Sequence, residues 1–565
     1  MSDRPRPLHS TSQRTERPQP HRPEPISTVW LDFETGRGLD NEGRPITPII
    51  AGRRQRPQLV DLLETARHHH ARDLVLCGAV PAQPGEWLLP SQRTVSRGAE
   101  HTPGWVDLGH YLEDFGMGRF RHEETQQRLN VRLAREWFPE PAPDQALDPA
   151  KARSAWESLT WVVQQATKRD WPLMRLPAQT GLNIWKLRAP ESYAMEHLDP
   201  DIGQQIQENE PQHRFEHYVE GPARCGCGDC LPLIAAGAEL AAFAFADGRF
   251  MFHGAPPKEL GAAPAWRLTQ RQAHDLFTTD PWHPARYRIR FTVPDFWNHV
   301  GMFPVRQEAG AARAWHWPNR PGSVHETWAD SREVNLAAEW FWQVEILEGV
   351  QFTKAASLQP FAYAIGKMLE LTETMVVDGQ PASPRRKQVV ASAVRHMYRT
   401  TIGSLARRSR TTSGFATDPS KVPAHAVGGV TPMHGGWIYQ VPTLAKPSDA
   451  DTWHPEIAAR VWATSRVQVL SSPTALVTRG RAAGQKRYGA LEVAPEQLIG
   501  IQGDAIYTGE VLDWTLPEKL GGGDDGRSGR IRLKGVVPGP LIAPSDWAAR
   551  QRLSHQAEQR GWTID

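Results

Sequence analysis

Two isolated acidic residues, each in an apolar and β-prone run, are the first candidates for chemistry. Asp504 interrupts "QLIGIQGDAIYTGEV" (497–511), and Asp247 ends the apolar part of "LAAFAFADGRFMFHG" (240–254). An apolar strand is a costly place for an unpaired carboxylate, so each acid needs a partner. Two such acids on adjacent strands of one sheet can hold two divalent cations for phosphoryl transfer. The alternative is that each acid lies at a strand end, solvated or bound to a turn.

A basic segment lies between the two acids along the chain. In "SPRRKQVVASAVRHMYRTTIGSLARRSR" (383–410), helical spacing places Gln388, Ser392, Arg395 and Arg399 on one stripe. Guanidinium groups can fork onto phosphate oxygens, so the stripe suits a nucleoside triphosphate. A solvated basic face and contact with a nucleic-acid backbone are the two other interpretations of these charges.

The order of these parts resembles the palm and fingers of family B DNA polymerases, with the protein-primed branch of phages and linear plasmids nearest. The first acid strand of that family carries Asp-x-x-Ser-Leu-Tyr, and "DGRFMF" (247–252) stands in its place. The resemblance implies that Asp247 binds metal and that the carbonyl of Gly248 also reaches metal. It implies that Phe252 is the aromatic residue that excludes a ribose 2′-hydroxyl.

The second acid strand and the late lysine strand resemble the same family less closely. The family's Asp-Thr-Asp-Ser becomes "QGDA", so Asp504 matches the essential second aspartate while Gln502 replaces the first. The later "RIRLKGV" resembles the strand that touches primer or incoming nucleotide, which makes Lys534 the candidate there.

The fingers helix departs furthest from the family pattern, Lys-x-x-x-Asn-x-x-Tyr-Gly. Alignment on Tyr398 puts Ala391 at the lysine, Arg395 at the asparagine and Arg399 at the glycine. We therefore expect Arg395, together with Arg399, to take over the binding of the triphosphate.

The resemblance implies an α+β and α/β multidomain fold. A ribonuclease-H-like N-terminal domain would precede a polymerase palm, fingers and thumb, with an antiparallel palm sheet. The expected parts are a disordered tail (1–25), an exonuclease-like α/β domain (26–198), the first part of the palm with a Cys-rich insertion (199–380), the fingers helices (381–415), the second part of the palm (416–540) and a C-terminal helical remnant of the thumb (541–565).

The implied activity is template-directed DNA synthesis by two-metal nucleotidyl transfer, in the replication of a phage, plasmid or other mobile element. The cofactors would be two Mg²⁺ ions, and the partners would be DNA, dNTPs and a terminal or priming protein. Arg407, Arg408 and Arg410 are the candidate DNA contacts. The alternatives are a catalytically inactive polymerase-like DNA-binding protein and a zinc-organised nuclease or accessory factor.

The N-terminal "WLDFETGRG" resembles the Asp-x-Glu-Thr motif that opens the proofreading nuclease of the same polymerases. In that motif Asp32 and Glu34 would lie on one face of a strand and bind metal for 3′–5′ hydrolysis. No second or third nuclease motif accompanies it, so a structural remnant is the favoured interpretation.

The segment "RCGCGDC" presents three closely spaced thiols. Cys225, Cys227 and Cys230 can give three thiolates to tetrahedral Zn²⁺, with His213, His217 or Cys77 as a fourth ligand. Zinc and no metal at all are both open interpretations, and the family resemblance does not require such a site.

Composition restricts the class of protein. The 565 residues are too many for one core, and 65 basic against 63 acidic residues give a net charge of only +2, so charge alone does not indicate a nucleic-acid binder. There is neither an apolar run of membrane-spanning length nor an apolar signal core at the N-terminus, and the few cysteines form no disulfide framework. A soluble, cytoplasmic protein is therefore expected.

The pattern of elements follows from hydrophobic periodicity. We expect strand-like and helix-like segments up to about residue 190, including a helix over 151–168, and a polar connection over 199–212. Alternating strands then indicate a half-buried antiparallel sheet, followed by helices over 358–410. The Gly- and Pro-rich stretch 411–450 is given no element.

Overall fold

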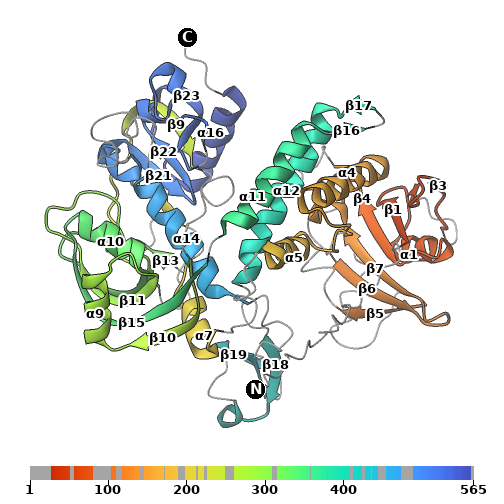
Figure 1. The fold of residues 1–565 in the computed structure, drawn as a ribbon, viewed down its shortest axis with the longest axis horizontal. Helices are drawn as coiled ribbons and strands as arrows, with labels where there is room; N and C mark the ends of the chain where they lie inside the picture. The colour runs from red at the N-terminus through yellow and green to blue at the C-terminus, as the bar shows by residue number, and fades with distance from the viewer. Residues whose placement is uncertain are drawn as a thin grey trace, which may run out of the picture. The chain divides into compact units, whose positions relative to one another are not determined.

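A computed structural model of the chain divides into two compact units, unit 1 (Met1–Glu157) and unit 2 (Ser158–Asp565) (Figure 1). The structure describes residues 27–50, 56–80, 104–109, 117–139, 146–170, 172–188, 198–211, 214–221, 226–248, 260–307, 315–356, 358–377, 379–406, 411–422, 427–433, 436–442, 453–472, 488–527 and 529–561. Both units mix helices with sheets, as the sequence predicts.

Unit 1 is built on a seven-stranded mixed sheet in the order β3-β2-β1-β4-β7-β6-β5. The central strands β1, β4 and β7 run parallel, whereas the outer pairs are antiparallel. Helix α1 (Leu59–His68) packs Leu62, Leu63 and Ala66 into the same core. The strands are β1 (Thr28–Asp32), β2 (Gly38–Leu39), β3 (Pro45–Ile46), β4 (Asp73–Cys77), β5 (Trp105–Gly109), β6 (Met117–His122) and β7 (Arg128–Leu133).

Helix α4 (Pro149–Thr167) confirms the helix predicted over 151–168, and the division between the units falls within it. Its Trp156 ring lies 5.9 Å from Trp30 and 5.3 Å from Trp137, in edge-to-face contacts. The guanidinium of Arg132 lies 4.2 Å from the centroid of the Trp156 ring. Some of the many tryptophans therefore serve core packing.

Unit 2 contains a five-stranded antiparallel sheet in the order β23-β9-β22-β21-β8, which we call the palm-like sheet. Its apolar residues alternate between two buried clusters, one on each face of the sheet. The strands are β8 (Phe215–His217), β9 (Glu239–Asp247), β21 (Leu498–Gln502), β22 (Ala505–Thr508) and β23 (Arg532–Ile542).

The C-terminal helix α16 (Trp547–Arg560) packs on one face of the palm-like sheet and buries Arg550 completely. The Arg550 Nη1 donates to the carbonyl of Glu216 at 2.6 Å, and its guanidinium lies 4.7 Å from the ring of Tyr507. Gly500 gives this guanidinium its space, because a Cβ there would lie 2.0 Å from Nη1.

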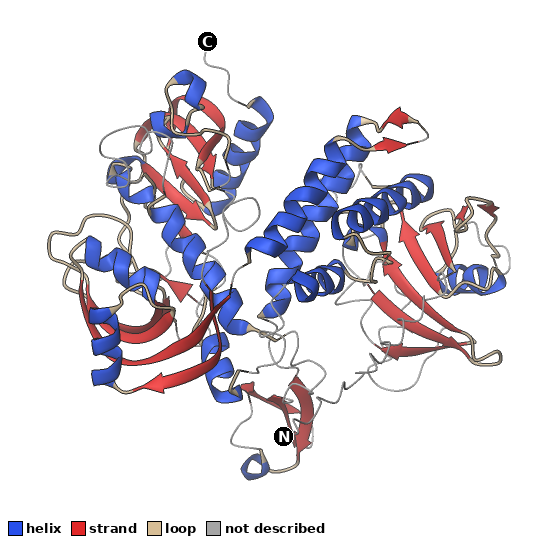
Figure 2. Ribbon diagram, in the orientation of Figure 1, coloured by secondary structure: helices blue, strands red, loops and turns tan. Residues whose placement is uncertain are grey.

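A second sheet in unit 2 has the order β10-β15-β11-β14, and helices α9 and α10 lie against it (Figure 2). Tyr287, Ile289 and Phe291 point into the core, while Arg288 and Arg290 on the opposite face form half-exposed ion pairs with glutamates of β14 and β15. The elements are β10 (Leu260–Leu268), α9 (Gln270–Thr279), β11 (Ala285–Thr292), β14 (Val324–Asp330), α10 (Ser331–Glu339) and β15 (Gln343–Ala356).

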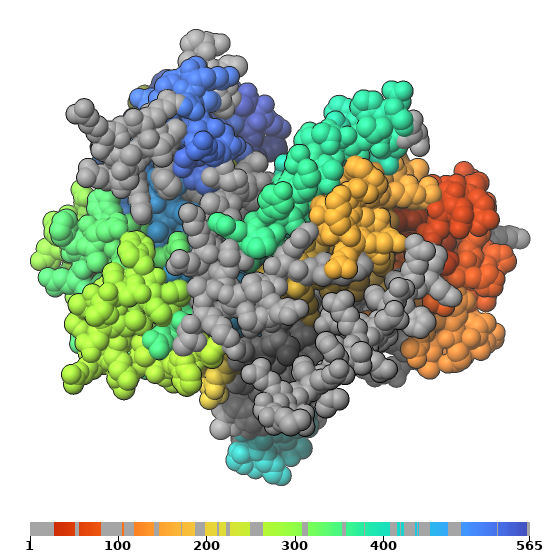
Figure 3. Space-filling view, viewed as in Figure 1, coloured from red at the N-terminus to blue at the C-terminus, as the bar shows by residue number. Residues whose placement is uncertain are grey.

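Helices α5 (Pro177–Arg188), α11 (Gln359–Glu373) and α12 (Pro384–Leu405) pack together in unit 2. Helix α12 begins at the cap Ser383, whose side chain accepts from Arg386 N, and Pro384 stands at the first helical position. It confirms the helix predicted for the basic segment, and the atoms of α11 and α12 form the green-teal surface in Figure 3.

Two stretches differ from the sequence prediction. The polar segment 199–212 contains helix α7 (Pro200–Glu208), because Asp199 caps it and Ile202 and Ile206, one turn apart, are buried. The stretch 411–450 contains a three-stranded antiparallel sheet of β18 (Thr411–Ala416), β20 (Gly436–Pro442) and β19 (Val427–Met433). These segments are strands because they pair with one another across the sheet, and the local composition does not show this pairing.

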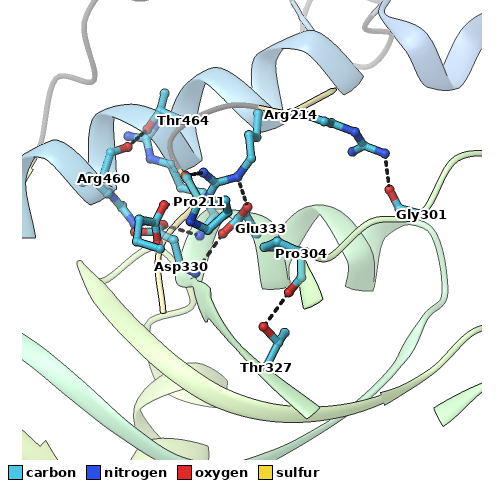
Figure 4. A network of polar contacts seen from close by, with 12 residues as sticks. Pro211, Arg214, Gly301, Pro304, Thr327, Asp330, Glu333, Arg460 and Thr464 are labelled. Atoms are coloured by element: carbon cyan, nitrogen blue, oxygen red, sulfur yellow. Dashed lines mark hydrogen bonds and ion pairs between the residues drawn. The ribbon is translucent and has the colours of Figure 1, made fainter. Parts of the chain in front are cut away.

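A buried ionic network joins helix α14 (Pro455–Leu470) to α10 and β14 (Figure 4). Arg466 donates to Glu333 at 2.8 Å and to Glu210 at 2.7 Å, and Arg460 bonds Asp330. All five side chains are almost fully buried. Buried charges are tolerated only when they are paired in this way.

Two short antiparallel pairs complete the unit, β12 (Val305–Arg306) with β13 (Trp315–His316) and β16 (Val376–Val377) with β17 (Gln380–Pro381). None of the described helices has the length and apolar content that a membrane span requires.

Candidate active site

Asp247 is the last residue of β9, at one end of the palm-like sheet. In the strand register it faces Ala505 of β22 on one side and Arg532 of β23 on the other. Its side chain is 13% exposed. A carboxylate is therefore held at the sheet end between two neighbouring strands.

Asp504 lies in the two-residue turn that joins β21 to β22, not within a strand as the sequence prediction has it. Gly503 precedes it with φ +63°, the left-handed conformation that such tight hairpins require at a central position. The carbonyl of Asp504 accepts a hydrogen bond from the N–H of Gly248 at 2.9 Å. The two acids, 257 positions apart in sequence, thus occupy adjoining backbone at one end of one sheet.

Lys534 supplies a cation to the same place. It is the extra residue of a β-bulge in β23, between Leu533 and Gly535, and its Nζ lies 3.5 Å from Asp247 Oδ1. Both side chains are mostly buried, so their attraction is less screened than that of an exposed pair. The bulge directs the lysine toward the carboxylate.

The donor set at this sheet end fits Mg²⁺ in a substrate complex. Mg²⁺ prefers oxygen ligands and is commonly held by one or two carboxylates together with substrate phosphates and water. Asp247 and Asp504 can supply the two carboxylates. Among the described residues no three or more His, Cys, Asp and Glu side chains form a group that could hold a metal ion.

Arg214 anchors the turn that carries Asp504. The N–H of Gly503 donates to the Arg214 carbonyl at 2.7 Å, and the fully buried guanidinium bonds Glu216 and the carbonyl of Gly301. Burial alone would lower the pKa of Arg214, but the carboxylate of Glu216 more than offsets this and raises it above its usual range. The cation therefore stays charged and the anchor stays in place.

The arginine stripe of α12 lies on the less buried side of that helix. Arg395 and Ser392 are half-buried, whereas Arg399 and Gln388 are exposed. The opposite side is core, including Ala391 and Tyr398, which the family alignment equates with a lysine and a tyrosine. The Tyr398 ring packs on Phe361, with centroids 5.4 Å apart, and burial raises the pKa of its hydroxyl.

Several predicted site residues lie outside the described residues, and nothing of their geometry enters the site: Phe252, Arg407, Arg408, Arg410 and Cys225. Of the proposed fourth zinc ligands, His213 also lies outside the described residues, His217 is in β8 paired with Gly500, and Cys77 is buried in β4 of unit 1. The zinc site therefore stays a prediction.

The nuclease candidates of unit 1 do not share one strand face. Asp32 ends β1, and Glu34 lies exposed in the turn that follows. Asp32 Oδ1 accepts from both the N–H and the hydroxyl of Thr35, each at 2.8 Å. The expected placement is wrong because the strand ends before it reaches Glu34.

Three arginines around the palm-like sheet were not singled out from the sequence. Arg532 pairs in register with Asp247, while Arg214 and Arg550 are fully buried beneath the strands of the candidate site. Nothing local marks the last two as buried, because an arginine is usually exposed. Arg532 stands in the quoted "RIRLKGV", where a second basic residue two positions before Lys534 is a usable signal.

No protein-family model and no curated protein match the chain. Among solved structures, it is similar to phi29 DNA polymerase in the ternary complex with primer-template DNA and incoming nucleotide substrates, in the complex with single-stranded DNA, and in the binary complex with primer-template DNA. In each case the identity is 10% and the TM-score 0.49, with 91% of this chain and 84–85% of the other chain covered. A likeness of this size does not fix the function, which has to come from the residues of the chain itself.

Proposed function

We propose that unit 2 is a template-directed DNA polymerase that adds deoxynucleotides to a primer. The observation that carries the proposal is the meeting of Asp247 and Asp504 at one end of the palm-like sheet, joined by the 2.9 Å bond from Gly248 N to Asp504 O. Lys534 supports it as well, because its ammonium lies 3.5 Å from Asp247 Oδ1. The protein would serve the replication of a phage, plasmid or other mobile element in the cytoplasm.

In this proposal Asp247, Asp504 and Lys534 place charged groups around the reacting phosphates. Bound Mg²⁺ would supply the Lewis-acid chemistry that phosphoryl transfer needs. Asp247 and Asp504 would hold the metal through their carboxylates. The backbone segments that carry these two residues are hydrogen-bonded to each other. Lys534 would balance negative charge where primer and triphosphate phosphates accumulate, because its ammonium already faces Asp247.

The remaining predicted site residues would bind the substrate. Arg395 and Arg399 would hold the triphosphate, Phe252 would exclude a ribose 2′-hydroxyl, and Arg407, Arg408 and Arg410 would contact the DNA backbone. The exposed position of Arg399 on α12 suits a phosphate contact. A terminal or priming protein would be a further partner.

For unit 1 we propose a structural remnant of a nuclease. The Asp32 carboxylate bonds the turn through Thr35, which is the role of a turn cap. Glu34 stands apart from it in the turn. Hydrolysis of single-stranded DNA that disappears in Asp32→Asn would contradict this proposal.

A non-catalytic DNA-binding protein is the second candidate. The specific observation in its favour is Gln502, which occupies the position of the family's first aspartate and accepts from the Tyr507 hydroxyl at 3.0 Å. An amide engaged in this way is a poor metal ligand. Such a protein would keep the polymerase shape and bind primed DNA without extending it.

A primer-extension assay separates the two candidates. The purified full chain is given primed template, four dNTPs and Mg²⁺, and Asp504→Asn and Asp247→Asn are the test variants. Extension should fall by about a hundredfold or more in both, as expected for loss of charge stabilisation at a metal site. Glu510→Gln is the matched control, an exposed acid close to the same hairpin, and should leave extension unchanged. Binding of primed DNA without any extension by the unmodified chain would support the second candidate.

A further inference from the structure

Cys227 and Cys230 lie side by side in the loop that connects β8 to β9. Their sulfurs are 3.4 Å apart, with the Cys227 thiol donating to Cys230 Sγ, and Cys230 Sγ lies 3.6 Å from the carbonyl of Trp317. Both residues are partly exposed. Two thiols in contact and within reach of solvent form a dithiol that small reagents can enter.

One end of this part of the loop is held by hydrogen bonds, and the glycines near the other end have open space around them. The side chain of Asn319 accepts from the N–H of Leu231 at 2.6 Å, and the carbonyl of Asp229 accepts from two successive N–H groups, those of Asn319 and Arg320. In contrast, Gly226 and Gly228 both have φ near +78°, and a Cβ at either would meet nothing within 4 Å. The chain around Cys227 therefore has room to move toward Cys230.

The described residues do not offer these thiols a complete metal site. No three or more His, Cys, Asp and Glu side chains among them form a group that could hold an ion. A disulfide needs no further ligand, only an approach of the two sulfurs to the bond length of about 2.05 Å. The Cys-x-x-Cys spacing is also that of redox-active dithiols.

We propose that Cys227 and Cys230 form a reversible disulfide on exposure to small disulfides such as oxidised glutathione. One cysteine thiolate attacks a sulfur of the oxidant, forms a mixed disulfide and releases one glutathione thiol, which takes up a proton. The second cysteine thiolate then attacks the protein sulfur of the mixed disulfide, forms the 227–230 bond and expels the second glutathione. The protein loses two electrons and two protons, and the oxidant gains them.

The bond would tighten the connection between two strands of the palm-like sheet. The loop lies between β8 (Phe215–His217) and β9 (Glu239–Asp247), the strand that ends at Asp247. No step of the proposed nucleotidyl transfer uses either thiol, so formation of the disulfide does not depend on that proposal. In a reducing compartment such a bond would form only transiently, as redox-responsive cysteine pairs do.

The test is oxidation of the full chain with excess oxidised glutathione, read by intact mass and by differential alkylation of the tryptic fragment 225–249, which holds all three loop cysteines. The expected result is a loss of about 2 Da, with Cys227 and Cys230 protected and Cys225 alkylated. Cys230→Ser should instead accumulate one glutathionyl group on Cys227. Cys225→Ser is the matched control and should still lose about 2 Da.

Three results would overturn the proposal. One is no loss of mass at any concentration of the oxidant, and another is protection of Cys225 together with one of the other two cysteines. The third is about one equivalent of zinc in the purified protein that blocks oxidation until a chelator removes it. Reduction of the oxidised protein by dithiothreitol should restore all thiols, which establishes reversibility.

Discussion

The packing of Gly500 against Arg550 gives a prediction that can be worked out from the structure. In Gly500→Ala the new Cβ would lie 2.0 Å from Arg550 Nη1 and 2.7 Å from the Glu216 carbonyl oxygen. Neither atom belongs to a flexible tip in open space, since Arg550 is 0% exposed. The guanidinium must leave its position, or β21 must move away from β8.

The cost follows from the contacts that would be lost. Nη1 donates to Glu216 O, and a hydrogen bond from a charged group is worth about 1.5–3 kcal/mol. The guanidinium also lies 3.8 Å from the Trp547 ring and 4.7 Å from Tyr507, contacts worth about 1–2 kcal/mol when desolvated. Overpacking adds about 1–3 kcal/mol. Because such terms are not additive, we expect the free energy of unfolding to fall by about 3–5 kcal/mol.

Urea unfolding measures the loss of global stability in Gly500→Ala, and amide hydrogen exchange measures the loss of local protection. Protection of residues 498–508, the hairpin that carries Asp504, should fall in Gly500→Ala, because this hairpin pairs with β8 and stacks on Arg550. Gly403→Ala is the control, an exposed glycine of α12 with nothing within 4 Å of its Cβ. It should raise stability by about 0.5–1 kcal/mol.

A double-mutant cycle provides the refutation. Removing the guanidinium in Arg550→Met also removes the clash, so the double variant with Gly500→Ala should lose at least about 1 kcal/mol less than the sum of the single losses. Additive losses, or unchanged protection of 498–508 in Gly500→Ala, would show that the steric reasoning is wrong.

Three further predictions concern charge. Lys534→Met should lower primer extension by about 10- to 100-fold with little loss of primed-DNA binding, and unchanged extension would remove the lysine from the site. Glu333→Ala removes one of the two carboxylates paired with the buried Arg466, leaving Glu210 in place, and should lower the free energy of unfolding by about 1.5–3 kcal/mol. The half-exposed Glu345→Ala should cost under about 1 kcal/mol in the same urea titration. Burial lowers the pKa of His299, so the unfolded state binds the proton more readily. The stability of unit 2 should therefore fall as pH drops below about 6.5, and His299→Gln should reduce this dependence, as seen in unfolding curves measured from pH 5 to 8.

The His299 prediction depends on a tautomer that the geometry requires. The N–H of Val300 donates to Nδ1 at 2.8 Å, so Nε2 must carry the hydrogen that it gives to the carbonyl of Val493 at 2.7 Å. A second proton on Nδ1 would face another donor. Both observations agree that the folded state holds this ring neutral.

The sequence by itself determined the elements whose signal is local. An apolar run that ends at Asp247 predicted a strand with the acid at its end, and helical spacing in the basic segment predicted α12. Such elements can be predicted from the sequence because side-chain periodicity involves only residues that are close together in the chain. The same local reading missed α7, whose short apolar stripe is outnumbered by polar residues.

Only the tertiary structure decided how distant segments combine. It placed Asp504 in a turn beside Gly248, brought Lys534 to Asp247 through a bulge, and buried Arg550 against Gly500. Strand pairing and the burial of a charge depend on groups hundreds of residues apart, and their free energy comes from contacts that exist only once the core has closed. A sequence can name the acids of a site, but the sheet that joins them is a property of the folded chain.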